Sequence, residues 1–106
     1  MMTNSDYSVF NLPRMLAKSK SITWQREVLS IFENLAFFLQ KNKLVSKTYV
    51  VKGKPIDKNA VIMNSELTEL GSKVVWEALD KWYNGHDRGK PIEDMWAFEK
   101  ALKKYS

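Results

Sequence analysis

Apolar residues recur at helical spacing in two long segments of the chain. In the first segment they step by four, three, four and three: Trp24, Val28, Ile31, Leu35 and Phe38. Residues three and four apart lie on one face of an α-helix, so this spacing predicts an amphipathic helix from Thr23 to about Lys41. The hydroxyl of Thr23 is expected to cap its first turn.

The second segment follows the same rule further along the chain. Its apolar residues step by three, four, four and four: Leu67, Leu70, Val74, Ala78 and Trp82. The pattern predicts a helix that is capped by Ser65 or Thr68 and runs to about Tyr83. Asn84-Gly85 is expected to end it, because both residues readily adopt the left-handed conformation that closes a helix.

Shorter helices are expected near both ends of the chain. The first has Pro13 in its first turn and three apolar residues on one face: Leu12, Met15 and Leu16. The second has Glu93 and Asp94 in its first turn, and its apolar face holds four residues: Met95, Phe98, Leu102 and Tyr105. Residues 1–10 show no period and are expected to be partly disordered.

Residues 44–63 carry strand-forming residues instead. Two β-prone stretches, 49–51 and 60–63, are separated by Gly53 and Pro55, which predicts a short β-hairpin. Five lysines decorate this segment: Lys43, Lys47, Lys52, Lys54 and Lys58. Lysines on an exposed strand either meet an anionic partner or keep the strand edge from aggregating, and the sequence leaves both interpretations open.

These elements predict a mainly α (α+β) fold, in which two long amphipathic helices flank a short β-hairpin and a C-terminal helix packs across them. The chain has 106 residues, 44% of them hydrophobic, which suits one core and a single domain over residues 1–106. There is no cysteine, the N-terminus has no secretory pattern, and no apolar stretch reaches about 20 residues. We therefore expect a cytoplasmic protein without a membrane span.

Charge is unevenly divided along the chain. Residues 1–60 hold ten Lys or Arg against four Asp or Glu, whereas residues 61–106 hold seven against eight. The net charge of +5 therefore belongs to the first half. Such asymmetry indicates an acidic or polyanionic partner, although a lysine-rich surface also serves solubility.

Candidate catalytic chemistry is sparse. His86, the only histidine, stands beside Asp87, and a solvated turn explains this pair better than acid–base catalysis does. No Cys or His cluster predicts a metal site, and the four isolated glycines form no phosphate-binding loop. We expect a non-enzyme that needs no cofactor and no metal, and a small enzyme using His86 and Asp87 ranks third among the hypotheses.

One resemblance to a known family covers residues 36–82. A helix is followed by Lys43-Leu44-Val45, by the lysine-rich segment, and by Glu66-Leu67-Thr68-Glu69-Leu70-Gly71 at the start of the next helix. This succession resembles the end of a winged-helix DNA-binding domain of the multidrug-regulator type. The resemblance implies phosphate contacts by the lysines of the wing: Lys47, Lys52, Lys54 and Lys58.

The chain departs from that family where DNA bases would be contacted. A helix-turn-helix needs two helices with a short turn between them, whereas the segment from Thr23 to Lys41 reads as one uninterrupted helix. The second half of that segment, 33–40, has no basic residue and is too apolar to face a DNA groove. Base recognition by this segment is not expected.

A second resemblance covers residues 66–106. The segment 66–71 is followed in order by Asp80-Lys81-Trp82, Asp87-Arg88-Gly89, Pro91 and Glu99-Lys100-Ala101-Leu102. This succession is similar to the C-terminal part of small bacterial immunity proteins, which are encoded beside contact-dependent or polymorphic toxins. The resemblance implies a cytoplasmic, non-catalytic protein that binds the C-terminal toxin domain of a large secreted protein.

The residue types of a protein interface are present, since Trp, Tyr and Arg dominate interface energetics and complementary charge speeds association. We expect the partner-binding residues to be Lys47, Lys52, Lys54, Trp82, Tyr83, Asp87 and Arg88. Core packing is the alternative for Trp82 and Trp76, and exposed aromatic residues would equally serve a homodimer. Because this chain is basic, the toxin would present an acidic face or contact the acidic C-terminal half.

The leading hypothesis is therefore an immunity protein that neutralises a toxin by blocking its active or partner-binding surface. The alternative is a winged-helix-like protein that binds nucleic acid through a basic β-ribbon. The sequence leaves the identity of the toxin and the oligomeric state open.

Overall fold

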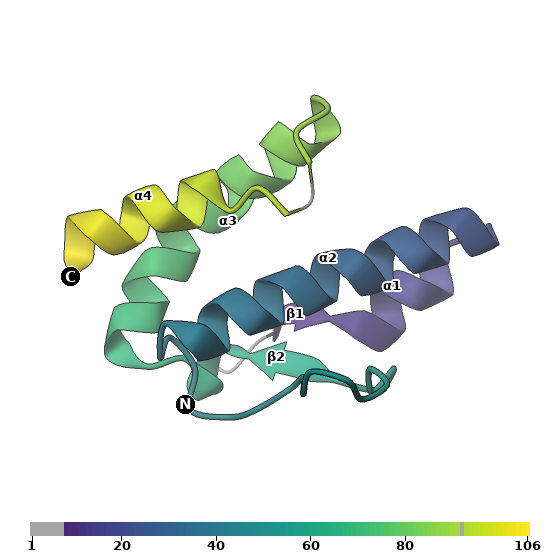
Figure 1. Ribbon diagram of the computed structural model, residues 1–106, viewed down its shortest axis with the longest axis horizontal. Helices are drawn as coiled ribbons and strands as arrows, with labels where there is room; N and C mark the ends of the chain where they lie inside the picture. Colours follow the sequence, from purple (N-terminus) through teal and green to yellow (C-terminus); the bar gives the residue numbers. More distant parts are fainter. Residues whose placement is uncertain (1–7, 92) are drawn as a thin grey trace, which may run out of the picture.

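The computed structural model describes residues 8–91 and 93–106, except for the side chains of His86 and Asp87. In chain order the elements are β1 (Ser8–Asn11), α1 (Leu12–Lys18), α2 (Ile22–Lys41), β2 (Val61–Met63), the 3-10 turn η1 (Asn64–Glu66), α3 (Glu69–Asp87) and α4 (Trp96–Tyr105). Figure 1 shows α2 across the middle of the molecule, with α4 and the end of α3 above it and the sheet below. The predicted mainly α fold is confirmed. No helix in the described ranges combines the length and the apolar character that a membrane crossing requires.

The strand pairing differs from the predicted hairpin. β1 pairs with β2 in antiparallel fashion, so the partner of the predicted second strand lies near the N-terminus. The segment 49–51, expected to be the first strand, is irregular. A bulge between Ser8 and Phe10 allows the adjacent side chains of Val9 and Phe10 both to be buried. Within the stretch 1–10 that was predicted to be partly disordered, Val9 and Phe10 therefore belong to the core, Ser8 is exposed, and residues 1–7 lie outside the described part of the chain.

Side-chain caps fix the starts of the first two helices. Asn11 accepts a hydrogen bond from the backbone N–H of Arg14 at 3.0 Å, which starts the short helix predicted around Pro13. α2 begins one residue earlier than predicted, because the hydroxyl of Ser21 and not that of Thr23 caps it. From there α2 continues without a break to the predicted end.

α3 begins as predicted and ends later than predicted. The hydroxyl of Thr68, one of the two predicted caps, accepts a hydrogen bond from the backbone N–H of Gly71 at 3.0 Å. Gly85 stays inside the helix, which continues to Asp87. The left-handed residue that closes the helix is Gly89, with φ +98°, and the N–H of the next residue donates to the Gly85 carbonyl at 3.0 Å.

α4 folds back onto α3 after a short connection (Figure 1). Glu93 and Asp94 precede this helix and do not form its first turn as predicted. A carboxylate oxygen of Asp94 instead accepts a hydrogen bond from the backbone N–H of Trp96 at 3.1 Å. The acidic residue still satisfies a free donor at the helix start, as a capping residue does.

Aromatic contacts join the elements in one core. Phe98 of α4 lies 5.8 Å from Phe38 of α2 and 5.3 Å from Trp82 of α3, measured between ring centroids. Phe10 of β1 lies 5.5 Å from Phe32 of α2. Rings at these distances contribute pair interactions in addition to their buried area. The apolar faces of α2 and α3 predicted from the sequence therefore meet in the core.

Candidate functional site

Residues 46–60, named here the anchored loop, connect the end of α2 with β2 (Figure 1). They form no strand and no helix. Irregular segments of this length are uncommon in small domains and usually serve a function. The loop holds three predicted partner-binding residues, Lys47, Lys52 and Lys54. The basic two-stranded ribbon that the winged-helix interpretation needs is absent from residues 46–60, because β2 pairs with β1 instead.

Gln40 of α2 binds the backbone of the anchored loop. Its side-chain oxygen accepts hydrogen bonds from the N–H groups of Tyr49 and Val50 at 2.7 and 3.0 Å. Its side-chain nitrogen donates to the Val50 carbonyl at 3.0 Å. Three hydrogen bonds from one side chain hold this part of the loop against α2, and Val50 is buried there.

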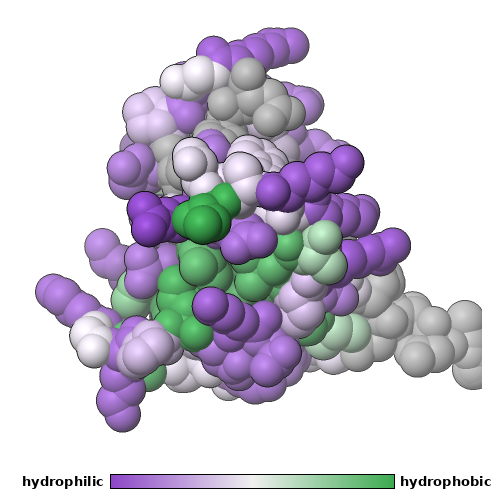
Figure 2. All heavy atoms as spheres, turned by 90° about the vertical axis from the view of Figure 1, so that its right-hand side faces the viewer, coloured by the Kyte–Doolittle hydropathy of each residue, from purple (hydrophilic) through white to green (hydrophobic). Residues whose placement is uncertain are grey.

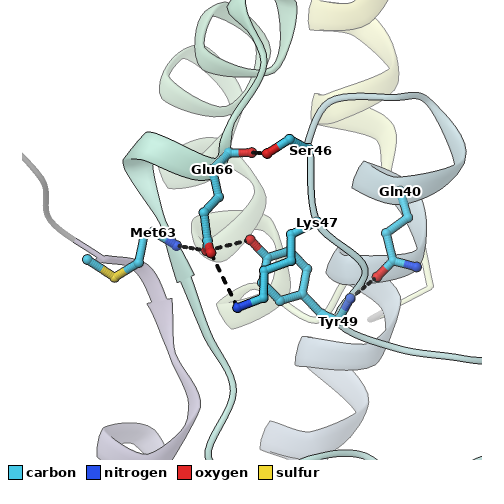
Figure 3. A network of polar contacts seen from close by, with 6 residues as sticks. All are labelled: Gln40, Ser46, Lys47, Tyr49, Met63 and Glu66. Atoms are coloured by element: carbon cyan, nitrogen blue, oxygen red, sulfur yellow. Dashed lines mark hydrogen bonds and ion pairs between the residues drawn. The ribbon is translucent and has the colours of Figure 1, made fainter.

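Glu66 binds the loop from the other side (Figure 3). Its carboxylate accepts hydrogen bonds from the Tyr49 hydroxyl at 2.6 Å and from the Met63 backbone N–H at 2.9 Å. It also lies 3.4 Å from the ammonium group of Lys47. The Glu66 carbonyl accepts from the backbone N–H of Ser46 at 2.8 Å. The first five residues of the loop are thus attached both to α2 and to η1.

The electrostatics of this network favour one protonation state. Burial alone would raise the pKa of Glu66, but hydrogen bonds from Tyr49, Met63 and Lys47 outweigh it and lower the pKa below its ordinary value. Burial, followed by the hydrogen bond to Glu66, raises the pKa of Tyr49. Both shifts favour a charged Glu66 carboxylate that accepts a hydrogen bond from a neutral Tyr49 phenol at neutral pH.

Beyond these anchors the loop turns and exposes its side chains. The backbone N–H of Lys54 donates to the Val51 carbonyl at 3.0 Å, and Gly53 supplies the positive φ of +84° that the turn contains. Val51 is 51% exposed, and Lys52 and Lys54 are exposed beside it. Figure 2 views the end of the molecule where the loop turns and shows an apolar area bordered by hydrophilic side chains.

The predicted aromatic contact residues are less exposed than expected. Trp82 is only 2% exposed, and its indole N–H donates to the Asp94 carbonyl at 3.2 Å, so this residue belongs to the core. Tyr83 is half-buried, with its ring 5.4 Å from that of Trp82. The exposed tryptophan of α3 is Trp76, which donates to Asn64 at 2.9 Å. Trp82 is therefore removed from the predicted partner-binding residues.

The remaining predicted residues lie elsewhere. Arg88 is exposed just after α3, and the side chain of Asp87, like that of His86, lies outside the described part of the chain. Figure 1 places the anchored loop and the end of α3 on opposite sides of α2, so the predicted residues do not form one surface. Among the described side chains, no group of three or more potential metal ligands occurs.

A groove between α3 and α4, named here the α3–α4 groove, is a second basic surface. Two hollows of about 440 and 340 Å³ share Lys81 and Trp96 and together define it. The cationic residues that line them are Lys81, Arg88, Lys90, Lys100 and Lys104. The described carboxylate in the lining is Glu77, which lies 2.9 Å from the Lys104 ammonium and accepts from the Tyr105 hydroxyl at 2.8 Å.

Trp96 sits at the centre of this groove. A Cβ atom on Gly85 would lie 3.2 Å from its indole nitrogen, so the missing side chain leaves room for the ring. The Lys90 ammonium lies 5.1 Å from the ring centroid. The indole nitrogen is buried and has no hydrogen-bond acceptor among the described residues. Packing therefore holds the ring in place.

Sequence reasoning missed Gln40 and Glu66 because only the fold brings their partners near. Gln40 binds backbone groups of Tyr49 and Val50, and Glu66 binds the Tyr49 hydroxyl and the Lys47 ammonium group. Sequence reasoning also missed the groove, although Ala97 and Ala101, four residues apart, are a signal for close helix contact.

The chain has no detectable relatives in three comparisons. No protein-family model matches it, and neither a curated protein nor a solved structure is significantly similar to it.

Proposed function

We propose that the chain is an immunity protein, which binds a cognate bacterial toxin in the cytoplasm and neutralises it by covering its active or partner-binding surface. The observation that carries this proposal is the anchored loop. Gln40 and Glu66 fix its base, and its tip presents Val51 with Lys52 and Lys54. A segment that is ordered before binding loses less conformational entropy in the complex, which favours affinity.

The chemistry of the tip suits a protein surface. An exposed apolar side chain next to two lysines offers desolvated contact together with electrostatic attraction to an acidic partner. The resemblance of residues 66–106 to immunity proteins supports a toxin as that partner. Thr68 and Gly71 of the shared motif serve the start of α3, so we assign that motif to the fold and not to the interface.

The winged-helix alternative has less support. α2 is one helix of 20 residues without the turn of a helix-turn-helix, and the lysines lie on an irregular loop. Binding of nucleic acid is therefore an outcome that the test must distinguish.

The test is co-expression of the chain with the toxin domain encoded by the upstream gene, read out as co-purification and restored growth. Lys52→Glu with Lys54→Glu reverses the charge of the loop tip, and Lys41→Glu with Lys43→Glu makes the same change at the C-terminal end of α2, away from the tip. The loop variant is expected to associate roughly tenfold more slowly with the toxin than the control variant. Absence of a complex, or salt-sensitive binding to duplex DNA instead, would contradict the proposal.

A further inference from the structure

The rim of the α3–α4 groove is strongly cationic. Lys81, Lys100 and Arg88 are exposed along it, on α3, on α4 and just after α3. The carboxylate of Glu77 is paired with Lys104 and also interacts with Lys81, so one negative charge faces the five cations of the lining. Cations gathered around a hollow raise the local concentration of anionic groups and favour their binding.

The floor of the groove is apolar and fixed. Ala97 and Ala101 are almost completely buried, and Ala78 faces them from α3. These small side chains let the two helices approach closely and leave the hollow above them. The half-buried ring of Trp96 forms the wall between the two hollows. A ligand for this groove therefore needs an apolar group as well as negative charge.

Carboxylates in and beside the groove argue against a uniformly charged strand. Glu77 lines the groove itself, and Glu99 lines an adjoining hollow of about 310 Å³ that also includes Trp96 and Lys100. A nucleic acid strand carries a phosphate about every 3.4 Å and would bring some of these phosphates close to the two glutamates. A polypeptide can place acidic side chains opposite the lysines and apolar or neutral ones elsewhere.

We infer that the α3–α4 groove binds an acidic segment of a partner polypeptide, with carboxylates at Lys81, Lys100 and Arg88 and an apolar side chain against Trp96. The partner is the toxin, so the inference rests on the proposed function and adds the chemistry of the recognised segment. From Ala78 to Arg88 the groove extends roughly 15 Å at about 1.5 Å per helical residue, a length that about five extended residues cover.

The experiment measures binding of a fluorescein-labelled peptide that alternates acidic residues with leucine, by fluorescence anisotropy. Lys81→Glu with Lys100→Glu reverses two of the charges in the groove, and Lys52→Glu with Lys54→Glu makes the same change in the anchored loop. All four side chains are exposed, so both variants are expected to fold. The groove variant should bind the peptide roughly tenfold more weakly, whereas the loop variant should stay within about twofold of the unmodified chain.

Equal weakening in both variants, or no binding by the unmodified chain, would overturn the inference. A single-stranded RNA that binds the groove more tightly than the peptide would overturn it as well. The peptide assay needs no toxin, so a missing toxin complex counts against the proposed function alone. If the toxin is neutralised equally well by the groove variant, the proposed function stands and the groove assignment is wrong.

Discussion

The anchored loop and the α3–α4 groove both present lysines, but they are held in place by different forces. In the loop, Gln40 and Glu66 reach across to backbone groups and hydroxyls. In the groove, two helices pack closely over Ala97 and Ala101. Polar anchors can be removed one at a time or protonated, whereas a packed apolar floor does not respond to pH. The loop is therefore the surface that solution conditions can alter, and the groove is the constant one.

The largest effect is expected where the loop leaves the core. A Cβ atom on Gly71 would lie 1.8 Å from the Leu44 carbonyl oxygen, the same oxygen that accepts from the Thr68 N–H at 2.9 Å. Gly71→Ala must push two backbone segments apart and should lower the free energy of unfolding by about 3 kcal/mol. Urea unfolding followed by circular dichroism measures it.

The matched control lies in the groove on the same helix. In Gly85→Ala the new Cβ would meet the Lys90 side chain at 3.0 Å and the Trp96 ring at 3.2 Å, and no backbone. Alanine has a higher helix propensity than glycine by about 1 kcal/mol, which offsets this crowding. We therefore expect only a small net change in the free energy of unfolding. If both variants lost the same free energy of unfolding, the contact with the Leu44 backbone would not explain the destabilisation in Gly71→Ala.

Gln40→Leu tests the first loop anchor. It removes three hydrogen bonds to the loop backbone and leaves the buried groups of Tyr49 and Val50 without partners, so a loss of about 2 kcal/mol is expected. Asn34→Leu on the same helix removes one hydrogen bond to Ser30 and should change stability by less than about 0.5 kcal/mol. The affinity of the groove for the acidic peptide should be unchanged in both variants. A lower affinity in Gln40→Leu would show that the conformation of the anchored loop affects binding in the groove.

Glu66→Gln should make the second anchor insensitive to acid. The pKa of Glu66 is lower in the folded chain than in the unfolded one, so its stabilisation is present above the unfolded value of about 4.3 and is lost as pH falls through the folded value. The variant should be about 1 kcal/mol less stable at pH 7, and this difference should shrink below about pH 4. A difference that stays constant with pH would contradict the assignment. Glu69→Gln, at a side chain that is 91% exposed, is the control.

The smallest effect is expected at Glu77. Hydrogen bonds from Lys104 and then from Tyr105 lower its pKa, but the pair lies at the surface, where the Lys104 side chain is exposed, and such pairs contribute little to stability. Glu77→Gln should leave the unfolding midpoint unchanged. Because it removes a negative charge from the groove, it should strengthen binding of the acidic peptide by about twofold. Weaker peptide binding would mean that Glu77 is needed to hold Lys104 and Tyr105 in the positions that the groove requires.

The helices were predictable because their signal is local. Apolar residues three and four apart determine where α2 and α3 run, and only the ends shift, at Ser21 and after Gly85. The sheet was not predictable in this way. β2 has three residues, too few for a period, and its partner is chosen by the burial of Val9 and Phe10 far away in sequence.

The candidate site was predictable only in part. The sequence indicates the loop lysines, since Lys52 and Lys54 flank a glycine in a turn-forming segment. It also shows that Trp82 continues the apolar stripe and that Trp76 does not, which agrees with their opposite exposure. It does not show that Gln40 and Glu66 hold the loop, because only the fold brings their partners near: backbone groups for Gln40, and the Tyr49 hydroxyl and Lys47 ammonium for Glu66.

The pairing of β1 with β2 also affects how the chain is made. Phe10 lies opposite Ile62, so a growing polypeptide cannot close its sheet until Ile62 has left the ribosome. Until then Val9 and Phe10 lack the strand that they pair with, and closing a span of roughly fifty residues is slower than forming a helix. A newly synthesised chain therefore acquires its anchored loop, which ends at β2, only after β2 itself has been made.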